Sequence, residues 1–171
     1  MFNYCIRLSG IKDGNHEYSF VVNNQFFDAF EQSEITNAKF EVIIILKKEG
    51  KKMNLSFNID GIITNFNCDL CASALEIPIS TSLSIILQET ENEMEDTDEI
   101  LYIHPNQCEI DVSHLIFEVI SLAIPSKREH NSESGVQCDK EMMVLLEQYA
   151  EKEEKIDPRW EVLNKLKDLK N

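Results

Sequence analysis

Hydrophobic and polar residues alternate along much of the first two thirds of the chain, which is the pattern of strands with one buried and one exposed face. The alternation is clearest over residues 38–47 and 53–67. The polar residues 48–51 between them are rich in lysine, contain a glycine and supply a turn. We therefore predict a long antiparallel hairpin, with a β-bulge near Gly61, where the second alternation is interrupted.

Other segments predict shorter elements on either side of this hairpin. Phe26, Phe27 and Phe30 fall on one helical face, so residues 24–31 are predicted to form a short helical or irregular segment that packs on the core. Four further segments are predicted strands: one alternates weakly, the second has aromatic and β-branched residues, the third is rich in Ile, Leu, Ser and Thr, and the fourth is short. They lie at residues 4–8, 16–22, 74–87 and 100–103.

Helical spacing of apolar residues replaces alternation in the last third of the chain. Two helices are predicted at residues 114–123 and 140–152. A third begins at Asp157-Pro158, an aspartate suited to the N-cap followed by a proline suited to the first helical position, and its Trp160 is predicted to pack against the sheet. The fold class predicted is α+β: a twisted antiparallel β-sheet or partial barrel with two or three helices, mostly C-terminal.

The length of 171 residues and the hydrophobic fraction of 43% favour one domain with a substantial core over residues 1–171. Within it, residues 1–110 are β-rich and residues 111–171 are helical. The longest apolar run, residues 115–124, is far shorter than the roughly 20 residues of a membrane-spanning helix. We see no secretory signal at the start of the chain, and a cytoplasmic location is therefore expected.

Charge narrows the choice of partners. The chain has 31 acidic and 16 basic residues, a formal net charge of 16 − 31 = −15. Seven acidic residues and no basic one lie within residues 88–99, which are predicted to form a solvated loop. A strongly negative body repels phosphate backbones, so any RNA contact needs a local basic patch or a protein intermediary. Solubility alone also accounts for such a charge.

Two basic clusters break the acidic field. The first surrounds the predicted hairpin turn and consists of Lys47, Lys48, Lys51 and Lys52. The second marks the last predicted helix and includes Lys155, Arg159, Lys165, Lys167 and Lys170. Either cluster could meet RNA phosphates or an acidic partner. Lysines at hairpin tips and helix ends also serve solubility and the helix dipole, so this interpretation has an ordinary alternative.

Five cysteines are present, an odd number that argues against a disulfide framework in a chain without an export signal. Cys68 and Cys71 form a Cys-x-x-Cys pair at the end of the hairpin, and such a pair can supply half of a tetrahedral metal site. His130 and Cys138, with seven residues between them in a polar segment, could supply the other half and hold a structural Zn²⁺. The alternatives are ordinary reduced thiols or, less favoured in an antiparallel setting, a thioredoxin-like redox pair.

Nothing in the sequence indicates an active site. We find no Gly-x-Ser-x-Gly elbow and no glycine-rich phosphate loop. His104 and His114 are isolated, and the carboxylates lie in acidic runs that suit a solvated surface. We therefore expect no enzyme, no small-molecule substrate and no membrane partner.

The order of these features resembles the YceD family, the large ribosomal RNA subunit accumulation proteins. The resemblance rests on a β-rich first half, the Cys-x-x-Cys at residues 68–71, the acidic loop, a helix ending in Leu-Ala-Ile-Pro, and the terminal run 157–167 that begins Asp-Pro-Arg-Trp. That terminal run is the most specific piece. The stretch from Ile124-Pro125 through His130 to Cys138 is similar to the version of the family found in Bacteroidetes-type bacteria.

The resemblance implies a bacterial, cytoplasmic, non-enzymatic ribosome biogenesis factor needed for accumulation of large-subunit ribosomal RNA. Its expected partners are ribosomal RNA precursors or large-subunit ribosomal proteins. Many relatives carry a second Cys-x-x-Cys near the C-terminus, whereas this chain has only His130 and Cys138 in that region. Two other hypotheses stay open: an enzyme acting on RNA, and a zinc-stabilised protein-interaction module that does not act on ribosomes.

Overall fold

The computed structural model describes residues 4–92, 94–130 and 137–149. Its strands and helices are, in chain order, β1 (Cys5–Arg7), β2 (Gly14–Val22), α1 (Asn24–Phe27), β3 (Ala38–Glu49), β4 (Lys52–Asn67), β5 (Ala74–Glu89), β6 (Ile100–Ile103), β7 (Glu109–Asp111), α2 (Ser113–Leu122) and α3 (Lys140–Tyr149). The last predicted helix and its Trp160 lie outside the described residues.

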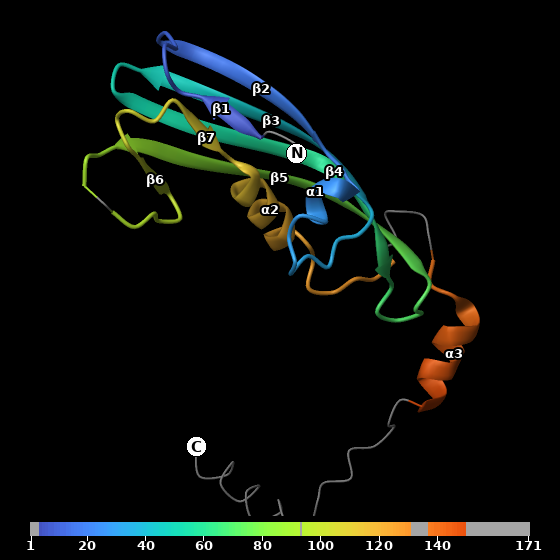
Figure 1. The fold of residues 1–171 in the computed structure, drawn as a ribbon. Helices are drawn as coiled ribbons and strands as arrows, with labels where there is room; N and C mark the ends of the chain where they lie inside the picture. The colour runs from blue at the N-terminus through green and yellow to red at the C-terminus, as the bar shows by residue number, and fades with distance from the viewer. Residues whose placement is uncertain (1–3, 93, 131–136, 150–171) are drawn as a thin grey trace, which may run out of the picture.

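The main sheet has five strands in the order β2-β3-β4-β5-β6, and β1 pairs with β7 in a separate two-stranded ladder. Figure 1 shows an open, twisted sheet, and α2 and α3 follow its strands late in the chain whereas α1 lies between β2 and β3, so the α+β prediction is confirmed. The sheet is mixed rather than wholly antiparallel, because β6 pairs with β5 in parallel. At the start of this parallel pairing, the N–H of Ile86 in β5 donates to the carbonyl oxygen of Glu99, the residue before β6 (2.8 Å).

The predicted hairpin forms two neighbouring inner strands of the main sheet. β3 and β4 pair from Ala38↔Ile63 to Glu49↔Lys52, around a turn in which Gly50 has a φ of 62°. The predicted bulge does not fall at Gly61 itself, because this glycine keeps the register with both neighbouring strands.

The irregularity lies instead in the pairing of β4 with β5, between Ile63 and Phe66. Gly61 has a different purpose, since a Cβ atom there would overlap the carbonyl oxygen of Lys39 and lie 2.7 Å from the Cα of Phe40. The interruption that suggested a bulge therefore marks a close approach of two strands.

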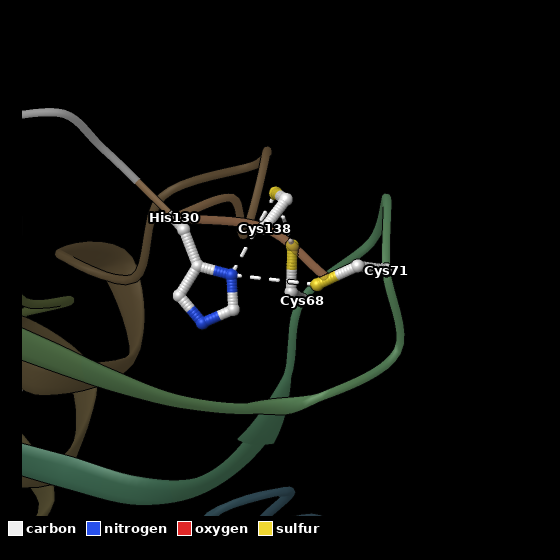
Figure 2. Close-up of side chains that lie close together, drawn as sticks. All are labelled: Cys68, Cys71, His130 and Cys138. Atoms are coloured by element: carbon white, nitrogen blue, oxygen red, sulfur yellow. Dashed lines mark hydrogen bonds between the residues drawn. The ribbon is translucent and has the colours of Figure 1, made fainter. Parts of the chain in front are cut away.

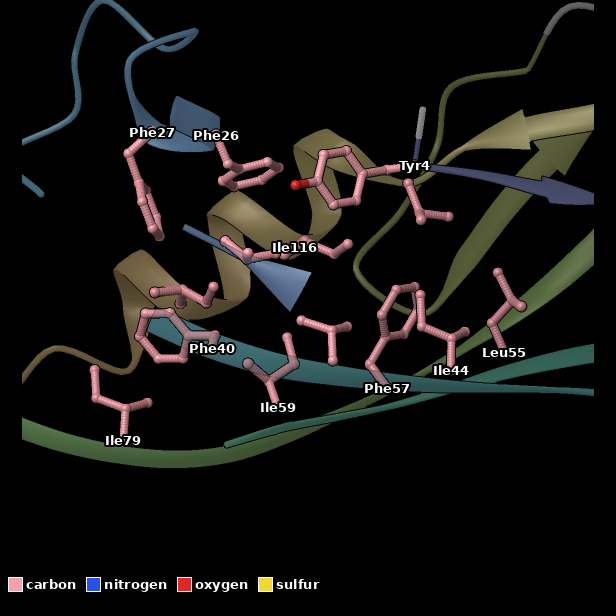
Figure 3. Close-up of a cluster of buried hydrophobic side chains, with 14 of the residues drawn as sticks. Tyr4, Phe26, Phe27, Phe40, Ile44, Leu55, Phe57, Ile59, Ile79 and Ile116 are labelled. Carbon is pink, nitrogen blue, oxygen red and sulfur yellow. The ribbon is translucent and has the colours of Figure 1, made fainter. Parts of the chain in front are cut away.

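The core lies between one face of the sheet and a layer made of α1, α2 and the β1–β7 ladder. Alternate residues of the long strands point into it, and Phe40, Ile44, Phe57 and Ile59 are fully buried. Figure 3 shows these side chains facing Ile116 of α2 across the layer. The opposite face of the sheet carries the polar half of the alternation, as period-2 patterning requires.

The acidic segment differs slightly from its predicted bounds of 88–99, because β5 continues to Glu89. Residues 91, 92 and 94–99 are exposed, so the charges on these residues are solvated. Among the residues that the structure describes, no helix is long and apolar enough to cross a membrane.

Candidate metal centre

The end of the sheet opposite the lysine-rich hairpin turn carries the turn between β4 and β5 (Figure 1). The N–H of Cys68 donates to the carbonyl oxygen of Ser73 (2.8 Å), and the N–H of Ala72 donates to the carbonyl oxygen of Cys68 (2.9 Å). Ala72 has a left-handed φ of 57°, which bends the chain back within a few residues. This tight turn holds Cys68 and Cys71 side by side, and both cysteines are buried.

The segment after α2 is tied to this turn by a reciprocal pair of bonds. The N–H of Asp69 donates to the carbonyl oxygen of Arg128, and the N–H of Arg128 donates to the Asp69 carboxylate, each at 2.7 Å. The Arg128 guanidinium lies 4.1 Å from the ring centre of Phe66 and 3.1 Å from the carboxylate of Glu34. These contacts bring His130, two residues later, over the Cys-x-x-Cys turn.

The structure brings together all four residues that the sequence proposed as ligands. The ligand atoms of Cys68, Cys71, His130 and Cys138 lie within 4.8 Å of one another (Figure 2). The Sγ atoms of Cys68 and Cys138 are 3.7 Å apart, and Nδ1 of His130 lies 3.5 Å from Sγ of Cys71 and 3.7 Å from Sγ of Cys138. These three distances match the edges of a coordination tetrahedron.

A tetrahedral Zn²⁺ has Zn–S bonds of about 2.3 Å and Zn–N bonds of about 2.1 Å, which set sulfur atoms about 3.8 Å apart and sulfur from nitrogen about 3.6 Å. A disulfide is excluded for this arrangement, because it requires sulfur atoms about 2.05 Å apart. The donor set and its spacing therefore fit a metal ion, and the four residues could bind one.

The hydrogen bonds of His130 prepare it as a ligand. Its Nε2 donates to the carbonyl oxygen of Ala74 (3.2 Å), because a carbonyl can only accept. In the neutral imidazole the lone pair is then on Nδ1, the atom that faces the sulfurs (Figure 2). A backbone carbonyl behind a ligating histidine is the usual second support of a metal site, since it fixes both the tautomer and the ring orientation.

The thiols of the cluster have divergent acidities. A hydrogen bond from the Ser73 hydroxyl, 2.9 Å away, lowers the pKa of Cys71 to about 6. Burial would raise the pKa of Cys68, but backbone N–H groups of Cys71 and Leu70 outweigh it and lower that pKa. Burial, together with the two neighbouring thiols, raises the pKa of Cys138 to about 11. A bound dication would remove this last penalty by neutralising the crowded thiolates.

The first basic cluster lies at the tip of the β3–β4 hairpin, as predicted, but two of its lysines already contact other groups of the chain. Lys48 donates its Nζ to the carbonyl oxygen of Ile11 (3.2 Å), and Lys47 pairs with Glu49 (2.8 Å). Lys51 and Lys52 are exposed. The other predicted binding residues Arg159, Lys165 and Lys167 lie outside the described residues.

Sequence reasoning missed the residues that assemble the cluster. Arg128 and Asp69 join the two halves, and Ser73 sets the acidity of Cys71. A serine two positions after a Cys-x-x-Cys was the one available signal. The pairing of Arg128 with Asp69 had none, because 59 positions separate the two residues.

A comparison with protein families matches the region of the chain that contains all four candidate ligands. The family model described as large ribosomal RNA subunit accumulation protein YceD matches residues 55–167, about two thirds of the chain. Neither the curated proteins nor the solved structures contain a match. Because the family model spans more than half of the sequence, this chain belongs to the YceD family.

Proposed function

We propose that this chain is a non-enzymatic, cytoplasmic ribosome biogenesis factor needed for the accumulation of large-subunit ribosomal RNA. The observation that carries the proposal is the YceD family match over residues 55–167. It acts by binding ribosomal RNA precursors, large-subunit ribosomal proteins, or both. The net charge of −15 favours basic ribosomal proteins as partners of the acidic surface. RNA would bind only at local basic patches.

The proposal includes a structural Zn²⁺ held by Cys68, Cys71, His130 and Cys138. Its support is the ligand spacing and the histidine orientation described above. Four protein ligands leave no open coordination position, so the ion would cross-link the chain without catalysing a reaction. The cross-link would tie the segment that leads into α3 to the end of the sheet.

The exposed hairpin tip is the proposed contact for RNA phosphates. Lys51 and Lys52 lie at the turn with their side chains in solvent, and Lys47 and Lys48 flank them. In a protein with this net charge, an exposed group of lysines is a surface that a phosphate backbone could approach.

Co-sedimentation with large-subunit precursors from growing cells tests this function. Lys51→Gln/Lys52→Gln should reduce association with precursors, and the loss should shrink at high salt as phosphate contacts are screened. Lys39→Gln is the matched control, because Lys39 is an exposed lysine near the other end of β3. Equal association of the tip variant and the control would refute the tip contact.

The rival function is a zinc-stabilised interaction module that does not act on ribosomes. Both functions predict zinc, so elemental analysis of untagged protein does not separate them. Co-purification does: an enrichment of large-subunit precursors with the wild-type chain supports the ribosomal function. Stoichiometric zinc with no enrichment of ribosomal RNA or ribosomal proteins would refute it in favour of the rival.

A further inference from the structure

α3 presents apolar side chains to solvent instead of to the core. No residue of this helix is buried. Met142, Leu145, Leu146 and Tyr149 are spaced i, i+3, i+4 and i+7, and their exposed fractions are 37%, 44%, 42% and 83%. We call these four residues the α3 stripe. Figure 1 shows α3 beyond the end of the sheet, where it covers neither sheet face.

The start of α3 is nevertheless well anchored. The carboxylate of Asp139 accepts from the N–H of Met142 (3.0 Å) and caps the helix. Cys138, the residue before it, belongs to the metal cluster. The cluster therefore fixes where the helix begins and presents its stripe from a defined position, which reduces the ordering that a partner would have to impose.

A helix of 10 residues with no packed face is marginal in water, since isolated helices shorter than about 12–15 residues rarely persist. Four large apolar side chains on one side of such a helix are the pattern by which one amphipathic helix docks on another. The stripe is therefore an unpartnered docking face, and its surroundings indicate what covers it.

Charge selects the partner. Residues 139–154 contain six acidic and two basic residues, so the helix and its flank carry 2 − 6 = −4. A second copy of this chain would bring the same acidic flank and a further body of −15, which disfavours self-association. RNA offers neither an apolar face for the stripe nor a charge that an acidic flank attracts. An amphipathic helix flanked by lysine and arginine satisfies both requirements.

We propose that the α3 stripe docks a Lys/Arg-rich amphipathic helix of a large-subunit ribosomal protein. This inference rests on the proposed ribosomal function and names its protein contact. The apolar stripe supplies the buried centre of the interface, and the acidic flank supplies the steering and the choice of partner. The hairpin tip, at the other end of the sheet, remains free for a different contact.

The first test uses the full chain and a fluorescent synthetic probe, an amphipathic helix of leucine and lysine, with a scrambled peptide of the same composition as reference. Leu145→Gln/Tyr149→Gln should weaken binding of the amphipathic probe about tenfold, the loss typical of removing anchor side chains. Val144→Gln is the matched control, because Val144 is 52% exposed on the opposite side of α3. Its affinity should stay within about twofold.

Two results of this test would overturn the proposal. Equal losses in the stripe variant and the control would show that the helix, and not its stripe, binds the probe. Equal affinity for the scrambled peptide would show that charge alone drives binding. Circular dichroism and zinc content, unchanged in both variants, confirm that the comparison concerns folded protein.

The second test identifies the partner in growing cells. A photo-crosslinking amino acid replaces Leu145 in one variant and Val144 in the other, and the joined product is identified by mass spectrometry. A crosslink from position 145, and not from 144, to a basic helix of a large-subunit ribosomal protein supports the proposal. A crosslink to a second copy, to the chain's own last residues or to RNA overturns it.

Parallel co-sedimentation separates this inference from the function on which it rests. If Leu145→Gln/Tyr149→Gln still associates fully with large-subunit precursors, the stripe proposal fails while the ribosomal function stands. If the wild-type chain itself does not associate, the ribosomal function fails.

Discussion

Removal of the metal should destabilise the chain by an amount that the positions of the ligands determine. The proposed ion would join the Cys-x-x-Cys turn to His130 across a loop of 130 − 71 = 59 positions. In the chain-entropy model, a cross-link that closes a loop of about 60 residues stabilises the folded state by about 4 kcal/mol. For a domain of this size, each kcal/mol moves the Tm by about 2–4 °C. We therefore expect the Tm to fall by about 8–16 °C when the ion is lost.

The assay is thermal unfolding of freshly prepared, reduced, untagged protein, with zinc measured in the same samples. A chelator and the variant Cys138→Ser should both lower zinc content and Tm. Cys108→Ser is the matched control, because Cys108 is an exposed cysteine outside the cluster. The reasoning is refuted if the zinc-free chain melts within about 2 °C of the loaded one, or if Cys138→Ser melts like Cys108→Ser.

Three further outcomes test other parts of the structure. Gly61→Ala should destabilise the chain by about 1–3 kcal/mol in urea unfolding, because its Cβ would collide with the backbone at Phe40; an unchanged midpoint would contradict this. Arg128→Ala should cost about 1 kcal/mol by the same assay, through the lost contact with Phe66 and a partly exposed ion pair. In chelated protein, the Tm of the wild type should exceed that of Cys71→Ser by a margin that grows as pH rises from 6 to 9. The pKa of Cys71 is lowered from 9.0 to about 6, so the stability that its thiolate gives is lost on acidification. A Tm difference that does not change with pH would contradict this.

The hairpin and the core were predictable because their cause is local. Alternation along residues 38–47 and 53–67 assigns each side chain to a face, and the structure buries the apolar half of both strands. The direction of β6 was not predictable. The four residues of β6, Ile100–Ile103, are too few for their sequence to show whether they run parallel or antiparallel to β5. A hydrogen bond from the N–H of Tyr102 to the Asp96 carboxylate helps to place this strand.

The metal cluster was predictable only at the level of chemistry. Cysteine and histidine are recognised as soft or borderline ligands from their identity, so four candidates could be named without knowing the fold. What brings them together is not visible in the sequence. Ala72 adopts a conformation that favours glycine, and the Asp69–Arg128 pairing joins residues far apart in the chain. Both depend on the packed structure.

The two proposed contact sites lie at opposite ends of one strand, which makes a prediction about how they combine. β4 begins at Lys52 in the basic tip and ends at Asn67, next to the first ligand. Sixteen residues of antiparallel strand span about 50 Å, so a partner held at both ends must be at least that long, as a ribosomal precursor is.

Sites this far apart contribute independently to the binding free energy. If the tip and the stripe bind one particle, the second contact forms at high effective concentration and both contacts add to the affinity. The fold-loss in precursor association of the combined variant Lys52→Gln/Leu145→Gln should then equal the fold-loss of Lys52→Gln multiplied by that of Leu145→Gln. A combined variant no weaker than its weaker parent would show that the two ends do not grip the same particle.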